Sequence, residues 1–208
     1  MKRYHPGGMT RRAFGATLFA ALLTGTALNS APAEAALNPA ENYVSKIADD
    51  VMALANSGQK GKALQNRFAS LMNRYINLRA IANFALGPYQ SKLPGNKKDE
   101  FYRLVSLYAA GLFSFYVEDF RGTELEIIST AKQGKFTVIH SAIKLKGGGR
   151  EQVRWRLAGG GSGFRVSDVN LKGVWLTISM KKRFGDVLKR SKGDFEALFA
   201  ELREAQSW

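Results

Sequence analysis

The spacing of apolar residues predicts helices in the first half of the chain. Apolar residues recur every three or four positions at Tyr43, Ile47, Val51 and Leu54, and again at Leu64, Phe68 and Leu71. Asn77 is expected to cap a third helix, which Gly87 and Pro88 then end. Asn96 and Asp99 form a variant of the capping box at the start of a longer helix. The wide apolar stripe of this helix consists of Phe101, Leu104, Val105, Tyr108, Leu112, Phe115 and Tyr116.

After Arg121 and Gly122 the hydrophobic period shortens, and the pattern predicts strands. The four predicted strands are residues 124–129, 135–146, 150–158 and 163–170. Glycine-rich stretches separate them, so we expect antiparallel hairpins and not phosphate-binding loops, which join a strand to a helix. In the third strand Val153, Trp155 and Leu157 face one way, and polar residues alternate with them. One face of the sheet is therefore predicted to be covered and the other to be wet.

Helical spacing returns toward the C-terminus. The first of these helices is expected to contain Val174, Trp175 and Ile178, and Asp194 is expected to cap the last one. Helices on both sides of a run of strands indicate an α+β fold. We predict a helical N-terminal half packed on a curved four-stranded antiparallel sheet, followed by C-terminal helices.

The N-terminal segment has the pattern of an export signal. A basic start is followed by an apolar stretch over residues 13–28 and then by small residues that suit cleavage. Arg11 and Arg12 resemble a twin-arginine signal. The apolar stretch is too short and too rich in glycine and threonine for a good membrane span. We expect residues 1–35 to be a twin-arginine-like signal peptide and residues 36–208 to be a single exported domain.

Composition excludes several kinds of chemistry. The chain has 31 Lys+Arg against 17 Asp+Glu, a formal net charge of +14, and it has no cysteine. The absence of cysteine excludes disulfide scaffolds and thiolate zinc sites. The two histidines, His5 and His140, are too few for a histidine metal cluster. Such basic charge often indicates nucleic acid, but export argues against that partner. Anionic lipid headgroups, acidic surface polymers or a plain solvated face are the alternatives.

The densest basic cluster lies near the C-terminus. It consists of Lys181, Lys182, Arg183, Lys189, Arg190 and Lys192. Helical spacing distributes these charges around the axis, which is typical of a solvated helix. Docking to anionic headgroups or to an acidic partner is the functional alternative.

Two further patterns allow a function. His140 and Asp168 can form an acid–base pair in a pocket, although a lone histidine on a strand is more often structural. The aromatic residues of the long helix and the sheet form either an ordinary core or the lining of a cavity. Periodicity does not distinguish these two interpretations.

Several segments in order resemble a known family. They are residues 75–87 (YINLRAIANFALG), 101–105 (FYRLV), 163–174 (GFRVSDVNLKGV), 184–188 (FGDVL) and 193–202 (GDFEALFAEL). In this series the chain resembles the MlaC, or toluene-tolerance, family, the periplasmic phospholipid-binding component of the Mla lipid-trafficking system. The resemblance covers nearly the whole chain that follows the predicted signal peptide.

The resemblance implies a non-enzymatic lipid carrier in the periplasm. It implies a fold like nuclear transport factor 2 with a helical cap, and acyl chains held in a cavity between helices and sheet. It implies no cofactor besides the lipid cargo. The implied partners are an inner-membrane ABC lipid transporter complex and an outer-membrane lipoprotein and porin complex, and nucleic acid is not among them. Trp175 replaces a residue that is commonly small in relatives, and some relatives are linked to hopanoids, so the cargo is either a phospholipid or a polycyclic lipid.

Facing and family position together suggest which residues line the cavity. They are Leu104, Val105, Tyr108, Leu112, Phe115, Tyr116, Ile139, Ile143, Val153, Trp155, Phe164, Val166 and Ile178. The basic cluster is expected to meet a headgroup or a docking partner. Two rival functions stay open, a pocket enzyme that uses His140 and Asp168, and an exported basic protein that binds acidic surface polymers.

Overall fold

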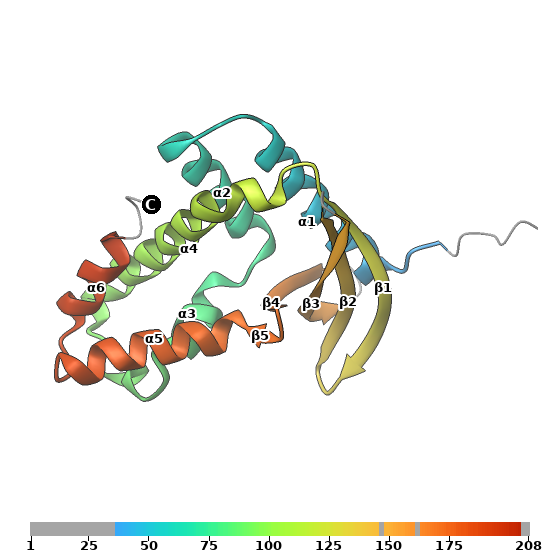
Figure 1. Ribbon diagram of the computed structural model, residues 1–208. Helices are drawn as coiled ribbons and strands as arrows, with labels where there is room; N and C mark the ends of the chain where they lie inside the picture. The colour runs from blue at the N-terminus through green and yellow to red at the C-terminus, as the bar shows by residue number, and fades with distance from the viewer. Residues whose placement is uncertain (1–35, 146–147, 161–162, 205–208) are drawn as a thin grey trace, which may run out of the picture. The chain divides into compact units, whose positions relative to one another are not determined.

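The computed structural model describes residues 36–145, 148–160 and 163–204. These residues form six α-helices, two short 3-10 helices and one five-stranded antiparallel sheet (Figure 1). The predicted α+β class is confirmed. The predicted signal peptide lies outside the described residues. Within the described part of the chain, no helix is both long enough and apolar enough to cross a membrane.

The first three helices follow the predicted apolar spacing. They are α1 (Pro39–Asn56), α2 (Gly61–Tyr75) and α3 (Leu78–Leu86). Asn38 begins α1 in a capping box with Glu41, which periodicity does not reveal, because each side chain accepts the backbone N–H of the other residue. Asn77 caps α3 as predicted and accepts the N–H of Ala80 at 3.2 Å. Gly87, with a φ of 53°, then ends α3.

The long helix α4 (Lys98–Phe120) does not begin as predicted. Lys97 occupies its N-cap position and makes no side-chain hydrogen bond there, so the predicted capping box is wrong. Asn96 lies in the preceding 3-10 turn, η2 (Gly95–Lys97). Asp99 instead forms an ion pair with Arg79 of α3, at 3.4 Å. A long-range charge contact therefore replaces the local cap that the spacing suggested.

Two helices complete the chain after the sheet. They are α5 (Leu176–Arg190) and α6 (Phe195–Glu204). Asp194 accepts the N–H of Glu196 at 2.9 Å, as the predicted cap of the last helix should. The remaining short helix is a 3-10 turn, η1 (Gly87–Lys92), between α3 and α4.

The sheet has one strand more than predicted. Its order is β1 (Glu124–Gln133), β2 (Phe136–Leu145), β3 (Gly149–Gly160), β4 (Gly163–Leu171) and β5 (Val174–Trp175). The prediction that residues 174 and 175 begin a helix is wrong. Lys172 and Gly173 both have positive φ, 51° and 81°, and they reverse the chain so that β5 pairs with the end of β4. The helix therefore starts only at Leu176.

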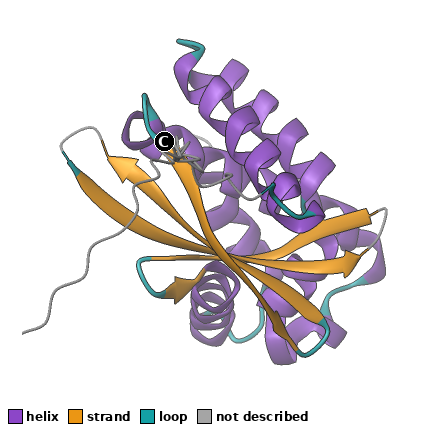
Figure 2. Cartoon of the chain, turned by 90° about the vertical axis from the view of Figure 1, so that its right-hand side faces the viewer, coloured by secondary structure: helices purple, strands orange, loops and turns teal. Residues whose placement is uncertain are grey.

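The two faces of the sheet differ as the alternation in the third strand predicts. Leu157 of β3 packs with Val44 of α1 on the covered face. On the opposite face, the guanidinium of Arg156 lies 4.0 Å from the ring centroid of Trp175 and 5.5 Å from that of Phe136. Figure 2 shows the strands fanning out in front of the helices.

Apolar side chains gather in three clusters, two of which bound the site described below. The sheet core, between α1, α2 and the sheet, contains Ala40, Val44, Ile47, Tyr75, Ile139, Leu157 and Val166. The helix core, among α3, α4, α5 and α6, includes Phe101, Leu104, Val105, Tyr108, Phe184, Leu198 and Phe199. In the third cluster the rings of Phe68 (α2) and Phe113 (α4) are stacked 4.0 Å apart.

Candidate functional site

A groove of about 690 Å³ lies between α2, α3, α4 and β4. It is lined by Ala69, Asn73, Ile76, Asn77, Leu78, Arg79, Tyr102, Arg103, Ser106, Leu107 and Arg165. Both polar and apolar side chains therefore form its walls. A ligand that fits it combines a polar group with an apolar part.

Backbone contacts between the α2–α3 junction and β4 position the groove. Ile76 pairs with Val166 in an isolated parallel bridge. The N–H of Asn77 also donates to the carbonyl of Val166, at 3.2 Å. These contacts bring the start of α3 beside Arg165, the neighbour of Val166 in β4, so residues far apart in the sequence line one groove.

Tyr43 of α1 braces the same junction. Its hydroxyl donates to the carbonyl of Tyr75 at 3.0 Å, and its ring lies 5.8 Å from the ring of Phe164. Burial raises the pKa of Tyr43, although the nearby Arg165 guanidinium acts in the opposite direction. Tyr43 is therefore neutral near pH 7 and does not cancel the positive charge of Arg165.

The charge of the groove is positive. Three arginines, Arg79, Arg103 and Arg165, line it, and no carboxylate is among its described lining residues. Arg79 pairs with Asp99 and lies over the ring of Tyr102, 5.0 Å from its centroid. Across the described ranges, neither Arg103 nor Arg165 has a carboxylate within ion-pair distance. The groove therefore favours an anionic group.

The apolar walls of the groove belong to the two large cores. Ile76 packs against the sheet core, and Leu78 and Tyr102 pack against the helix core. The groove thus lies where the two cores approach each other. A smaller cavity of about 410 Å³ adjoins it at Tyr102, whose hydroxyl is 2.9 Å from Oδ1 of Asn83.

The predicted lining residues lie in different parts of the molecule, and the groove is lined by others. Leu104, Val105 and Tyr108 are buried in the helix core, and Leu112 packs at its margin. Ile139 and Val166 are buried in the sheet core, where Trp155 and Phe164 pack against them. Ile143 and Val153 are buried in the sheet. The exposed members are Phe115, Tyr116 and Ile178, at 63%, 50% and 52%.

Sequence reasoning did not find the groove. Asn73, Arg103 and Arg165 lie between the apolar positions that define helices and strands, so periodicity treats them as solvent-facing. Asn77 was predicted as a helix cap only. The isolated bridge between Ile76 and Val166 brings the start of α3 to β4, and no local sequence pattern predicts such a bridge.

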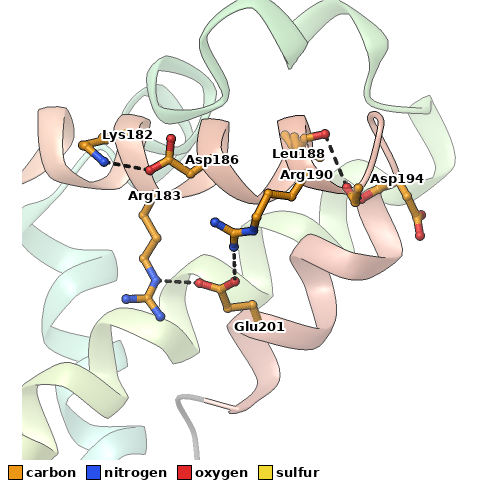
Figure 3. A network of polar contacts seen from close by, with 8 residues as sticks. Lys182, Arg183, Asp186, Leu188, Arg190, Asp194 and Glu201 are labelled. Atoms are coloured by element: carbon orange, nitrogen blue, oxygen red, sulfur yellow. Dashed lines mark hydrogen bonds and ion pairs between the residues drawn. The ribbon is translucent and has the colours of Figure 1, made fainter.

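The predicted docking cluster is partly neutralised (Figure 3). Lys182 pairs with Asp186 at 2.8 Å. Glu201 of α6 accepts from Arg183 at 2.7 Å and also pairs with Arg190 at 3.9 Å. The two contacts of Glu201 tie α5 to α6, whereas the Lys182–Asp186 pair lies within α5.

The other three members of the cluster lie outside that network. Lys181 lies over the ring of Phe84 of α3, 5.1 Å from its centroid. Lys189 and Lys192 are exposed. The free charge of the cluster is therefore smaller than the sequence suggests.

Asp168 does not form the predicted acid–base pair with His140. Its carboxylate accepts the hydroxyl and the N–H of Thr177, at 2.6 and 3.1 Å, and lies 3.5 Å from Arg156. His140 lies opposite Arg154 in the sheet register, and β3 separates it from Asp168. No group of potential metal ligands occurs among the described residues.

Comparison with known proteins identifies the family. A family model described as MlaC protein matches residues 45–204. Among solved structures, the chain is similar to a phospholipid-binding protein from Ralstonia solanacearum in complex with a phospholipid. The two share 17% sequence identity, the match covers 80% of this chain and 96% of that one, and the TM-score is 0.66. A search of curated proteins gives no match.

That structural likeness shows the shared fold, and the family match covers more than half of the chain. The resemblance seen in the sequence is thereby confirmed. The chain belongs to the MlaC family, whose members are lipid-binding carriers and not enzymes.

Proposed function

We propose that the chain is a periplasmic carrier that binds one phospholipid and moves it between membranes. The family match over residues 45–204 supports this function. The shared fold of a protein in complex with a phospholipid supports it further. The observation that locates the lipid site is the groove where the sheet core and the helix core approach each other.

The acyl chains pass from the groove between the sheet core and the helix core. On the sheet side Trp155, Phe164 and Val166 meet them, because these residues belong to the sheet core and Val166 forms the bridge beside the groove. On the helix side Leu104 and Val105 lie between the groove-lining residues Arg103 and Ser106 of α4 and are buried in the helix core. Two chains of about 15 methylenes each gain on the order of 20 kcal/mol on leaving water. Exposing these chains to water would cost the same free energy. A carrier therefore needs a buried apolar path that keeps them out of water.

The carrier works outside the cytoplasm, with residues 1–35 as its export signal and residues 36–208 as its single domain. Its partners are an inner-membrane ABC lipid transporter complex and an outer-membrane lipoprotein and porin complex. Lys181, Lys189 and Lys192 are the members of the basic cluster left for such docking, since the ion pairs of α5 and α6 occupy the others.

A transfer assay between vesicles tests the function. Donor vesicles contain isotope-labelled phosphatidylethanolamine, acceptor vesicles are unlabelled, and the label in the acceptors is followed over time. We expect transfer to rise in proportion to protein concentration and to fall only modestly with salt, because acyl-chain burial supplies most of the binding free energy and is not screened. Binding of acidic surface polymers predicts instead a steep loss of affinity with salt. A protein that transfers no label contradicts the proposal.

Two phenylalanines provide a matched pair of variants for this assay. Phe164 and Phe136 are both half-buried near a strand start, but only Phe164 lies on the covered face of the sheet. Phe164→Ala is expected to slow transfer several-fold, whereas Phe136→Ala should keep the wild-type rate. Equal rates for the two variants would contradict the proposed path of the acyl chains.

A further inference from the structure

We propose that the groove between α2, α3, α4 and β4 binds a phosphate group, with Arg103 and Arg165 as its charged ligands. The assignment of this phosphate to a lipid headgroup rests on the proposed function. The assignment of a phosphate site to the groove rests on the groove alone. The surplus positive charge, the start of α3 and the apolar walls all point to this ligand.

The groove has positive charge that no carboxylate among its described lining residues offsets. Arg103 and Arg165 are exposed, and no described carboxylate lies within ion-pair distance of either. Arg79 adds a third guanidinium, and its partner Asp99 is not a lining residue of the groove. A guanidinium presents N–H donors in a planar fork that matches two phosphate oxygens. A phosphate between Arg103 and Arg165 supplies the anion that the groove lacks.

The start of α3 also lies at the groove. Leu78 and Arg79 are the first two residues of this nine-residue helix, and both line the groove. The side chain of Asn77 caps the N–H of Ala80, one residue further into the helix. The positive end of the helix dipole is therefore at the groove, where it favours an anion.

The apolar walls of the groove indicate what the phosphate is attached to. Ala69, Ile76, Leu78 and Leu107 give the groove apolar walls, two of which continue into the cores. A phosphate ester of a diacyl lipid satisfies both the arginines and these walls. An uncharged polycyclic lipid leaves the guanidiniums without an anion. The groove therefore selects a phosphate-bearing lipid from the two cargo classes that the sequence leaves open.

The test compares two lipids with identical acyl chains, phosphatidylglycerol and diacylglycerol. Each is delivered to the delipidated protein as a cyclodextrin complex, and bound lipid is counted by native mass spectrometry. The variant Arg103→Gln/Arg165→Gln removes both charged ligands. The control Lys62→Gln/Arg67→Gln removes two exposed cations of α2 that do not line the groove. Arg103→Lys/Arg165→Lys keeps the positive charge but loses the planar fork of N–H donors that a guanidinium presents.

We expect the glutamine variant to bind phosphatidylglycerol at least about tenfold more weakly and diacylglycerol as well as the wild type does. The lysine variant should fall between the two, and the control should match the wild type. An unchanged affinity for phosphatidylglycerol overturns the assignment of the site to a lipid headgroup, and so does an equal loss for both lipids. Failure of the wild type to take up either lipid refutes the proposed function instead.

Inorganic phosphate distinguishes the two sources of the anion. Calorimetric titration at low salt should show phosphate binding to the wild type and the control, and no binding to the glutamine variant. Competition between phosphate and phosphatidylglycerol assigns the site to the headgroup. Phosphate binding that the variant abolishes without any change in lipid uptake assigns the site to free phosphate. Equal phosphate binding by the variant and the wild type overturns the site altogether.

Discussion

Asp168 joins the sheet to the helix that follows it. It is almost fully buried, and its two oxygens accept the hydroxyl and the N–H of Thr177 near the start of α5. Arg156 lies beside it and also stacks on Trp175 of β5. A buried carboxylate that bonds to a helix start and to a cation stabilises the fold. It accounts for Asp168 without any acid–base chemistry.

Asp168→Ala is predicted to lower the free energy of unfolding by about 3 kcal/mol, because it leaves the buried Thr177 hydroxyl without its acceptor and the half-buried Arg156 without its carboxylate. His140→Ala, on the adjacent part of the sheet, should cost less than about 1 kcal/mol and leave vesicle transfer unchanged. Urea denaturation measures both. A loss of transfer in folded His140→Ala would mean that this histidine contributes to lipid transfer.

At this scale the sequence predicts what is local. The caps at Asn77 and Asp194 were predicted because each contact joins residues two or three apart. The role of Asp168 was not, because its partner Thr177 lies beyond a reversal of the chain. Asn96 shows the converse error, since a plausible local cap gives way to a 3-10 turn.

Helix α4 illustrates how one element contributes to two clusters. Its first half packs in the helix core through Phe101, Leu104 and Tyr108. Its second half packs against α2 through Phe113, whose ring stacks on Phe68. Periodicity predicts one wide apolar stripe and does not show that the stripe faces different neighbours along its length.

Two phenylalanines of α4 test this division. Phe113 is 6% exposed, whereas Phe115 is 63% exposed. Phe113→Ala is predicted to destabilise the protein by about 3 kcal/mol, and Phe115→Ala by less than about 0.5 kcal/mol. Thermal or urea unfolding of the two variants gives the comparison. Similar losses for both would mean that the second half of α4 packs differently.

At the scale of elements, strong periodicity predicted the first four helices and the four long strands. It did not predict β5, a two-residue strand that depends on the positive φ of Lys172 and Gly173. It also did not predict the groove, which depends on the bridge between Ile76 and Val166. Pairings between distant segments are absent from a local pattern, and the candidate site is built on one of them.

For the whole molecule, the distribution of charge matters more than its sum. The net charge of +14 and the basic cluster suggest a docking face on α5. Asp186 and Glu201 neutralise part of that face. The groove has fewer cations but no carboxylate among its described lining residues. A small uncompensated site attracts an anion more specifically than a broad solvated surface does.

As a carrier, this chain should hold a phospholipid in the cell. The most direct measurement is native mass spectrometry of the protein purified from the periplasm, with extraction and identification of any lipid released. We expect one phospholipid per chain, released on denaturation. A protein that is reproducibly empty, and that takes up no phospholipid from vesicles, would contradict it.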